Sequence, residues 1–349
     1  MDLNKIHITP EILQLIAEID SFKGRWVAVD SMSPERLSSL KRQASIESVG
    51  SSTRIEGAIL SDSEVEALLS RLSTTSFLSR DEQEVAGYAE AMDLVFESHE
   101  DMPLTENHIR QLHKIMLHYS ERDERHRGSY KTLPNHVVAR DSSGAEHGVV
   151  FTTATPLETP QLMTDLVRRT TTALDESAHH PLVIIGAFIV EFLAIHPFQD
   201  GNGRLSRILT TLLLLRSGYI YVPYASLESV VEKNKEFYYK ALRRSQASLA
   251  TDNPDVNPWL GFFLRSLKKQ KDLLDSKVRE PAVPFRDEEL PRLSVQIVSE
   301  IRQHGRRSIA EIVSATGANR NTIKAHLRRL SEEGRIRQFG KGRGTWYAI

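Results

Sequence analysis

Residues 195–204, which read IHPFQDGNGR, place a histidine, a carboxylate, two glycines and an arginine in ten positions. Strongly apolar stretches flank this segment, at residues 182–195 and 205–215, and they predict two buried helices. A polar loop that joins two buried helices stands on a rigid base, as a catalytic constellation requires. The segment is therefore the first candidate for a functional site.

The glycines and arginines of this segment have the chemistry of a phosphate site. Gly201 and Gly203 let the backbone approach a ligand closely, at the point where the second helix begins. Free N–H groups and the positive end of the helix dipole favour an anion there. Arg204 and Arg207 are three residues apart, so they share a helical face and can reach the same polyphosphate.

The same segment also offers a metal ligand and a base. Asp200 supplies a hard oxygen suited to magnesium bridging phosphates. His196 is the residue best able to accept a proton near neutral pH. The alternative is a well-capped loop with a satisfied core histidine. So much buried polarity without a ligand would cost free energy for every unpaired group, which favours a binding site.

The run His196 to Arg204 resembles the signature of the Fic family, HPFxDGNGR, and Arg207 matches the second arginine that usually follows it. Residues 127–131, RGSYK, resemble the segment that leads to the flap hairpin of the family, and residues 151–166 resemble its exit into the next helix. The resemblance implies a mainly α fold, a Fic-type helical bundle with a β-hairpin flap. We expect that flap at about residues 136–152, with its turn at residues 141–144.

The resemblance implies a protein adenylyltransferase (AMPylator), which transfers AMP from ATP to a Ser, Thr or Tyr hydroxyl and releases pyrophosphate. It implies that His196 is the base that deprotonates the target hydroxyl and that Asp200 holds Mg²⁺. The intact Asn202 and Gly203 favour nucleotidyl transfer over the phosphotransfer of relatives with an altered loop. The residues expected to bind the nucleotide are Gly201, Asn202, Gly203, Arg204, Arg207 and Tyr239.

Two further parts of the ligand sites follow from the resemblance. Tyr238 and Tyr239 resemble a position near the adenine pocket, with core packing as the alternative, and Gln246 stands where an asparagine is expected. The flap is expected to pair, strand to strand, with the target protein, or with another copy of the chain itself.

Residues 51–57, SSTRIEG, end a predicted helix of about 35–57 and resemble the family's inhibitory motif S-x-x-x-E-G at Ser52, Glu56 and Gly57. A glutamate in the last helical turn opposes the macrodipole by ~0.3–1 kcal/mol, so a compensating partner is expected. The resemblance implies that Glu56 pairs with Arg207 and removes the arginine that would hold the γ-phosphate. Some relatives use this glutamate to position water and remove AMP, so the reverse hydrolysis stays open.

The C-terminal residues form a basic region. Residues 291–349 hold twelve Lys and Arg and four Asp and Glu, a net charge of +8, which leaves −9 on the rest of a chain of net charge −1. Three predicted helices, at residues 294–304, 308–316 and 319–333, and a two-stranded wing, at 335–339 and 345–349, are typical of a winged helix. We expect duplex DNA or a docking protein as its partner. The outward basic face predicted for the third helix consists of Arg320, Asn321, Lys324 and Arg328.

Composition limits the remaining possibilities. The chain has no cysteine, which fits a reducing compartment, and no signal peptide or apolar run of roughly 18 residues, so we expect a soluble cytoplasmic protein without membrane contact. A homodimer is possible. The rival function is a transcription regulator that only senses nucleotide. The expected domains are an N-terminal helical region at 1–100, a catalytic core at 101–275, a linker at 276–292 and the winged helix at 293–349.

Overall fold

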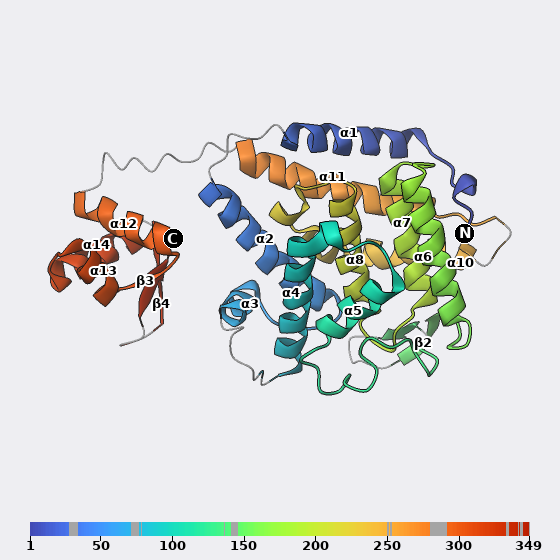
Figure 1. Ribbon diagram of the computed structural model, residues 1–349, viewed down its shortest axis with the longest axis horizontal. Helices are drawn as coiled ribbons and strands as arrows, with labels where there is room; N and C mark the ends of the chain where they lie inside the picture. The colour runs from blue at the N-terminus through green and yellow to red at the C-terminus, as the bar shows by residue number, and fades with distance from the viewer. Residues whose placement is uncertain are drawn as a thin grey trace. The chain divides into compact units, whose positions relative to one another are not determined.

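The computed structural model describes residues 1–27, 34–70, 77, 79–135, 137–140, 146–249, 251, 253–279, 292–332, 335–340, 342 and 345–348. The chain is mainly helical and divides into two compact units, Met1–Lys277 and Val278–Ile349 (Figure 1). The mainly α architecture, with a β-hairpin in the first unit and a small helical domain at the C-terminal end, agrees with the prediction. No described helix is both long enough and apolar enough to cross a membrane.

The helices of the first unit run from close to the N-terminus to residue 279, and three short 3-10 helices lie among them. The α-helices are α1 (Pro10–Val27), α2 (Pro34–Ile55), α3 (Asp62–Leu69), α4 (Arg80–Ser98), α5 (Glu106–Met116), α6 (Thr159–Asp175), α7 (Pro181–Ile195), α8 (Asn202–Arg216), α9 (Leu227–Lys233), α10 (Lys235–Leu249) and α11 (Asn257–Arg279). The 3-10 helices are η1 (Leu3–Lys5), η2 (His99–Asp101) and η3 (Val222–Tyr224).

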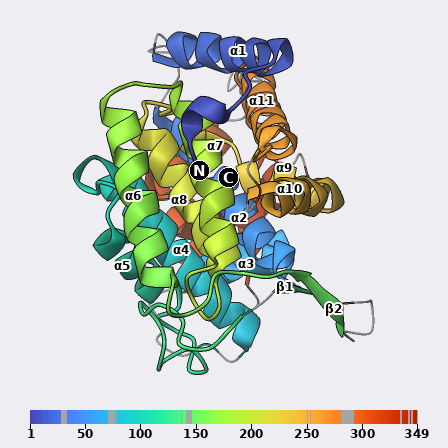
Figure 2. The same ribbon diagram turned by 90° about the vertical axis from the view of Figure 1, so that its right-hand side faces the viewer.

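Helices α7 and α8 form the centre of this unit, as their apolar sequences predict. They pack against each other, with α6 and α10 against α7 and with α2, α4 and α5 against α8 (Figures 1 and 2). Almost every side chain of α7 is buried, and α8 is buried from Leu205 to Leu215. The loop between them therefore rests on the best-packed part of the molecule.

The ends of the helices follow local sequence signals. Gly57, predicted to stop α2, has φ +112°, a left-handed conformation that glycine adopts without strain. The capping box predicted at Ser61 and Glu64 is present at the start of α3. The sequence also predicts helical structure from residue 231 to 248, and the structure has two helices there with a break that the pattern does not indicate. Asn234 ends α9 in a non-helical conformation, and α10 begins at the next residue.

The hairpin predicted within the helical unit consists of β1 (Val137–Arg140) and β2 (Glu146–Phe151), which pair antiparallel. Val137 lies opposite Phe151, and the register shifts between successive pairs. The two strands project from the helical body (Figure 2). The predicted turn at 141–144 lies outside the described residues, as does most of the predicted linker, from 280 to 291.

The second unit contains three helices and a small sheet. The helices are α12 (Arg292–His304), α13 (Ile309–Thr316) and α14 (Arg320–Glu332), and the strands are β3 (Arg307–Ser308), β4 (Arg337–Phe339) and β5 (Trp346–Ala348). Strands β4 and β5 pair antiparallel, as predicted for the two-stranded wing, and β3 joins β5 from the other side, which was not predicted. The missed strand has only two residues, which is too short to give an alternating pattern.

The core of the second unit is small and apolar. Ile323, Leu327 and Leu330 of α14, whose helical spacing predicts an inward apolar stripe, are fully buried against residues of α12 and α13. The four residues predicted to face outward are all exposed: Arg320, Asn321, Lys324 and Arg328.

Candidate active site

The loop between α7 and α8 begins with a strained backbone conformation at His196. This residue caps the C-terminal end of α7 with φ 53° and ψ 61°, and its N–H donates to the Phe192 carbonyl at 2.9 Å. A left-handed conformation costs a non-glycine residue about 1–3 kcal/mol, so the surroundings must hold it in place. Among the described residues, Ser177 is the other non-glycine with positive φ.

The ring of His196 has a defined tautomer. Its Nδ1 lies 3.2 Å from the Leu193 carbonyl, which can only accept a hydrogen bond, so Nδ1 carries the proton and Nε2 keeps the lone pair. Burial lowers the pKa of His196 to about 4 and Lys131 acts in the same direction, although the Leu193 bond, Glu56 and Asp200 oppose them. The imidazole is therefore neutral at physiological pH, in the form that can accept a proton at Nε2.

The turn into α8 is closed by side-chain hydrogen bonds. Gly201 has φ 78°, and Asn202 starts the helix. The Asn202 amide accepts from the Phe198 N–H at 2.9 Å and donates to the Phe198 carbonyl at 2.7 Å, and the residue is 1% exposed. Asn202, predicted to contact the nucleotide, therefore has both ends of its side chain engaged in shaping the loop.

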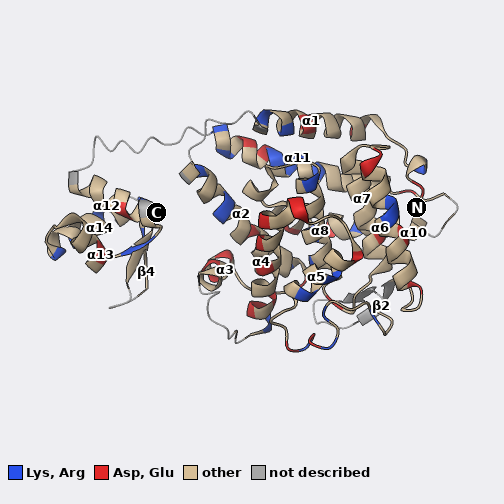
Figure 3. Ribbon diagram, in the orientation of Figure 1, with Lys and Arg blue, Asp and Glu red and all other residues tan. Residues whose placement is uncertain are grey.

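Arg204 lies buried beneath the loop, at 2% exposure. Its Nη1 lies 3.1 Å from Oε2 of Glu84, which reaches it from α4, a helix rich in acidic side chains (Figure 3). Its Nη2 lies 3.8 Å from Oδ1 of Asp200. Within the described part of the chain, the Nε of Arg204 is buried without a hydrogen-bond partner, an expensive arrangement in the absence of a ligand.

Arg207 is held by the end of α2. Its Nε donates to Ser52 Oγ at 2.8 Å, and its Nη2 donates to the Ser52 carbonyl at 2.9 Å and to Glu56 Oε1 at 2.8 Å. Burial alone would lower the pKa of Arg207, but Glu56 and two neighbouring tyrosines raise it, so the guanidinium stays charged. Its Nη1 is a second buried guanidinium nitrogen with no partner among the described atoms.

The carboxylate of Glu56 occupies the space beside Gly203. A Cβ built on Gly203 would lie 2.2 Å from Glu56 Oε1 and 2.9 Å from its Cδ, so only glycine admits this approach. The structure also corrects the position predicted for Glu56. The helix ends at Ile55, and Glu56 lies in the turn that follows, with its N–H bonded to the Thr53 carbonyl at 3.1 Å. Its charge thus faces the N-terminus of α8, where the dipole favours it.

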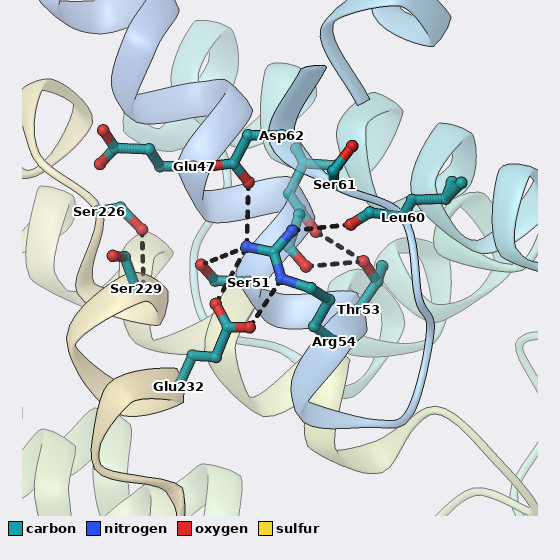
Figure 4. A network of polar contacts seen from close by, with 12 residues as sticks. Glu47, Ser51, Thr53, Arg54, Leu60, Ser61, Asp62, Ser226, Ser229 and Glu232 are labelled. Atoms are coloured by element: carbon teal, nitrogen blue, oxygen red, sulfur yellow. Dashed lines mark hydrogen bonds and ion pairs between the residues drawn. The ribbon is translucent and has the colours of Figure 1, made fainter. Parts of the chain in front are cut away.

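The turn that carries Glu56 is fixed by Arg54 (Figure 4). The guanidinium of Arg54 donates from Nε to Glu232 Oε1 of α9 at 2.7 Å and from Nη1 to the Leu60 carbonyl at 2.9 Å, and its Nη2 pairs with Asp62 of α3 at 3.0 Å. Hydrogen bonding to Glu232 raises the pKa of Arg54. Arg54 of α2 thus connects α9 with residues 60–62, which lead into α3, and we call this set of contacts the Arg54 clamp.

Asp200, the predicted magnesium ligand, offers a single carboxylate at the turn into α8. Its Oδ1 accepts from the Gly201 N–H at 2.6 Å, and its Oδ2 lies 3.7 Å from Arg80 Nη2. In the described ranges no three His, Cys, Asp or Glu side chains gather closely enough to enclose a metal ion. A magnesium ion would thus depend on phosphate oxygens and water for its other ligands, as is usual for a nucleotide-bound magnesium.

The residues predicted to lie near the adenine are found next to the turn that carries Glu56. Tyr238 is buried, and Tyr239 is half-buried with its hydroxyl donating to the Ile55 carbonyl at 3.4 Å. Burial raises the pKa of Tyr239, and the charge of Glu56 adds to this. Tyr239 therefore borders the site, while Tyr238 packs in the core.

His113 of α5 supports the loop and was not identified from the sequence. The Gly128 N–H donates to its Nδ1 at 2.8 Å, so its Nε2 carries the proton and donates to the Asp200 carbonyl at 3.0 Å. Its ring stacks on Phe198 at a centroid distance of 3.8 Å. Burial lowers the pKa of His113 to about 4, which keeps it neutral. A histidine inside an amphipathic helix gives no sign of this contact in the sequence.

Comparison with known proteins agrees with this arrangement. Residues 103–214 match the Fic/DOC family, and residues 290–337 match the winged helix-turn-helix DNA-binding family. The chain therefore carries a Fic domain followed by a winged helix, and the predicted family is confirmed.

Solved structures resemble the chain over most of its length. A Fic family protein from Desulfovibrio desulfuricans is 25% identical, with a TM-score of 0.63 over 98% of this chain and 97% of that one. A Fic domain containing signaling protein from Bacteroides thetaiotaomicron is 26% identical, with a TM-score of 0.59 over 75% of this chain and 94% of that one.

Curated relatives match a shorter stretch. The protein adenylyltransferase Fic of Drosophila virilis is 32% identical over 99 residues, which is 28% of this chain and 18% of that protein. The Drosophila melanogaster protein of the same name is 28% identical over 149 residues, 42% of this chain and 25% of that protein. The chain thus spans a quarter or less of the length of these relatives.

Proposed function

We propose that the chain is a protein adenylyltransferase, which moves AMP from ATP to a Ser, Thr or Tyr hydroxyl of a target protein. One observation carries this proposal. Two buried arginines, Arg204 and Arg207, each have an unpartnered N–H nitrogen within the described structure, and both stand on the helix that begins directly after the loop of a neutral histidine. Buried guanidinium groups with unused N–H donors are stabilised when an anion binds to them. A neutral histidine beside that anion can accept the proton of a bound hydroxyl.

The phosphates would bind at the start of α8. Gly201 and Gly203 leave room for the backbone to approach a phosphate, and the helix N-terminus favours its charge. Arg204 and Arg207 would neutralise the charge that develops as the phosphate bond breaks. Asp200 would hold magnesium, which when bound neutralises phosphate charge and aligns the triphosphate. Tyr239 would border the base.

His196 would act as the general base. Its Nε2 takes the proton of the target hydroxyl while the hydroxyl oxygen forms a bond to the α-phosphorus. The bond from that phosphorus to the bridging oxygen breaks, and pyrophosphate leaves with the electron pair. The hairpin of β1 and β2 would present the target segment by main-chain pairing, which positions a hydroxyl with little demand on sequence.

Glu56 would restrain this reaction. Its carboxylate already pairs with Arg207 and fills the space against Gly203, so it stands where a phosphate oxygen of ATP would have to lie. ATP could then enter only in a pose without its γ-phosphate contact. The chain would represent the subclass of Fic proteins with an N-terminal inhibitory helix, and the part of the chain before residue 100 would serve mainly to carry that restraint.

The test uses ATP labelled at either the α- or the γ-phosphate, with cell lysate as the source of targets and with the chain itself as a possible target. Label from the α-phosphate and none from the γ-phosphate should appear on protein. His196→Ala should abolish the transfer, and His118→Ala, which removes an exposed histidine of the same unit, should leave it intact. Equal transfer by the His196→Ala variant would refute the proposal.

The same site also suits the reverse hydrolysis. The side chain of Glu56 is 32% exposed and lies beside the proposed phosphate position, where it could orient a water molecule toward the phosphorus of an AMP-modified hydroxyl, so that AMP leaves and the hydroxyl is restored. Incubating an AMP-modified target with wild type and Glu56→Gly distinguishes the two directions. Release of AMP by wild type alone would make removal the main activity.

For the second unit we propose duplex DNA as the partner. Its support is the exposed basic face of α14 together with the match to a DNA-binding family. If the Fic domain only senses ATP and does not modify protein, the DNA affinity should respond to ATP while no label is transferred. A cytoplasmic location and a homodimer are further parts of the proposal, and size-exclusion chromatography with light scattering tests the second.

A further inference from the structure

Lys131 is a buried lysine behind the catalytic loop, and none of the roles proposed above uses it. The residue is 3% exposed, and burial lowers the pKa of its ammonium to about 8, so it is mostly charged at neutral pH. A buried charge is costly unless polar groups surround it. Three oxygens do so, and they come from three different segments of the chain.

One of these contacts is with the catalytic loop. Lys131 Nζ donates to the carbonyl of Ile195, the residue before His196, at 2.9 Å. The backbone N–H of Lys131 donates to the carbonyl of Pro197, the residue after His196, at 2.8 Å. One lysine therefore holds the peptide groups on both sides of the strained histidine.

The other contacts are with the residues at the two ends of the hairpin. Lys131 Nζ donates to Asn135 Oδ1 at 2.8 Å, just before β1, and to Thr153 Oγ1 at 3.1 Å, just after β2. The Thr153 hydroxyl in turn donates to Asn135 Oδ1 at 3.1 Å. The ammonium thus ties together the two ends of the element on which the target is proposed to dock.

Asn135 completes the connection. Its Nδ2 donates to the His196 carbonyl at 3.3 Å and to the Phe198 carbonyl at 2.5 Å. Lys131 and Asn135 together therefore bond to the carbonyls of four consecutive loop residues, from 195 to 198. If the residues at the two ends of the hairpin move, the backbone of His196 must therefore move with them.

We propose that Lys131 is a positioning residue that couples the hairpin to the loop of His196 and holds the backbone of this histidine in its strained geometry. The proposal rests on the proposed function for its kinetic part, but its structural part does not need ATP. Lys131 touches no reacting atom and acts through His196.

The charges around His196 give this proposal a specific signature. The charged groups that act on the ring are Lys131, which favours the neutral form, and Glu56 and Asp200, which favour the protonated form. Glu158 is the charged group that acts on Lys131. Removing the ammonium leaves only the two carboxylates, so His196 should bind its proton more tightly.

The first test measures the protonation of His196 directly, by NMR titration of the full chain labelled at histidine, with the His196→Asn spectrum to assign its signal. Lys131→Met should raise the pKa of His196 by about one pH unit. Lys131→Arg, which keeps the charge, should leave it close to the wild-type value. The control Lys114→Met removes an exposed lysine of α5 and should change nothing. An unchanged pKa in Lys131→Met would overturn the electrostatic part of the proposal.

The second test measures AMP transfer in the Glu56→Gly background. Lys131→Met should lower kcat by roughly 10- to 100-fold, because small misplacement of a base is that costly, and should change the KM for ATP by less than about threefold. The acid limb of the pH profile should also move to higher pH, which a general loss of folded protein would not cause. A uniform loss of activity at every pH would mean that Lys131 is merely structural.

Two variants keep the proposal testable if Lys131→Met does not fold. Asn135→Ala and Thr153→Val each remove one part of the connection and should lower kcat severalfold without altering the KM for ATP; wild-type kcat in both would refute the coupling. If the Glu56→Gly protein transfers no AMP at all, the proposed function fails. The NMR titration then decides the role of Lys131 without it.

Discussion

Helices α8 and α14 both carry basic residues, yet they hold them in opposite ways. On α8, Arg204 and Arg207 are 2% and 6% exposed and are paired with Glu84 and Glu56. On α14, the residues of the basic face lie exposed to solvent. The first arrangement fixes each guanidinium in one geometry, whereas the second leaves the basic side chains in contact with water.

This difference separates two kinds of anion recognition. A buried, oriented guanidinium discriminates one small anion by its shape, and losing its partner leaves an uncompensated charge in the interior. An exposed basic face attracts an extended polyanion through many weak contacts, each of which is screened by salt. We therefore expect substitutions around α8 to change activity sharply and substitutions on α14 to change affinity gradually.

The largest change in activity that we expect comes from replacing Glu56, the partner of Arg207. Glu56→Gly should raise AMP transfer roughly 10- to 100-fold, the effect of about 1.4–2.7 kcal/mol, because Arg207 becomes available to the γ-phosphate. Glycine suits this position because Glu56 lies in a turn and not in the helix. The measurement is the initial rate of label transfer from α-labelled ATP.

A matched control for that substitution is Glu66→Gln, which removes a glutamate of α3 that pairs with Arg42 at the surface. Its rate should equal that of wild type. If Glu56→Gly transfers AMP no faster than this control, the inhibitory role of Glu56 is lost and the pair with Arg207 is only structural.

Burial in the catalytic unit should also make its stability depend on pH. The pKa of His113 and that of His196 are lowered from 6.5 to about 4 in the folded state, so their stabilising neutral form is fully present above pH 6.5. Stability is lost as the pH falls from 6.5 towards 4, because the unfolded chain binds protons first. Between pH 7 and pH 5 the free energy of unfolding should fall by about 2 kcal/mol for each histidine.

Urea denaturation at the two pH values measures this effect, and His113→Gln should reduce the difference. A free energy of unfolding that is equal at pH 7 and pH 5 would show that these histidines are not buried as neutral groups.

Disrupting the Arg54 clamp should weaken the restraint that we propose for Glu56, although the substitution lies outside the Glu56–Arg207 pair. Arg54→Gln removes the ion pairs with Glu232 and Asp62 but leaves Glu56 and Arg207 untouched. We expect AMP transfer to rise by roughly threefold to tenfold, the effect of about 1 kcal/mol, because the turn holding Glu56 loses part of its support. The same rate assay measures it.

Glu232→Gln should reproduce part of the rise caused by Arg54→Gln, and the double variant should add little to Arg54→Gln alone, since the Arg54–Glu232 contact is lost in both single variants. Additive effects of the two substitutions would argue against a shared clamp. A rate below that of wild type would mean that this turn supports catalysis instead of restraining it.

The smallest expected effect concerns α14. Lys324→Ala should lower the affinity for duplex DNA and reduce the slope of log affinity against log salt concentration by about 0.9, which is the loss of one phosphate contact. Lys240→Ala, an exposed lysine of α10, is the control and should leave the slope unchanged. Fluorescence anisotropy at several salt concentrations measures both. DNA binding that does not weaken with salt would contradict the proposed basic face.

The sequence alone allowed the loop, its two flanking helices and the pairing of Glu56 with Arg207 to be predicted, the last through the Fic resemblance. These features are local, or they carry a long motif. The supporting contacts were not predictable. Glu84 is 120 residues from Arg204, and Lys131 is 64 residues from Ile195. Nothing in the spacing distinguishes Glu84 from the other glutamates of α4, because packing of the helices selects the partner.

The helix boundaries also differ in how well they could be predicted from the sequence. Periodicity identified the helices, and Gly57 and Ser61 marked their ends, because caps are encoded by single residues. The break at Asn234 was missed, since asparagine also occurs within helices and the apolar pattern continues on both sides. The role of Asn202 within the loop likewise depends on a folded backbone that returns to Phe198.

The most direct test of the central claim is a crystal structure of the Glu56→Gly protein soaked with ATP and magnesium. We expect the triphosphate to lie along the turn at Gly201 and Gly203, with the γ-phosphate paired to Arg207 and the α-phosphate facing Nε2 of His196. Nucleotide bound elsewhere, with this turn empty and Arg207 still bonded to Ser52 alone, would contradict the account.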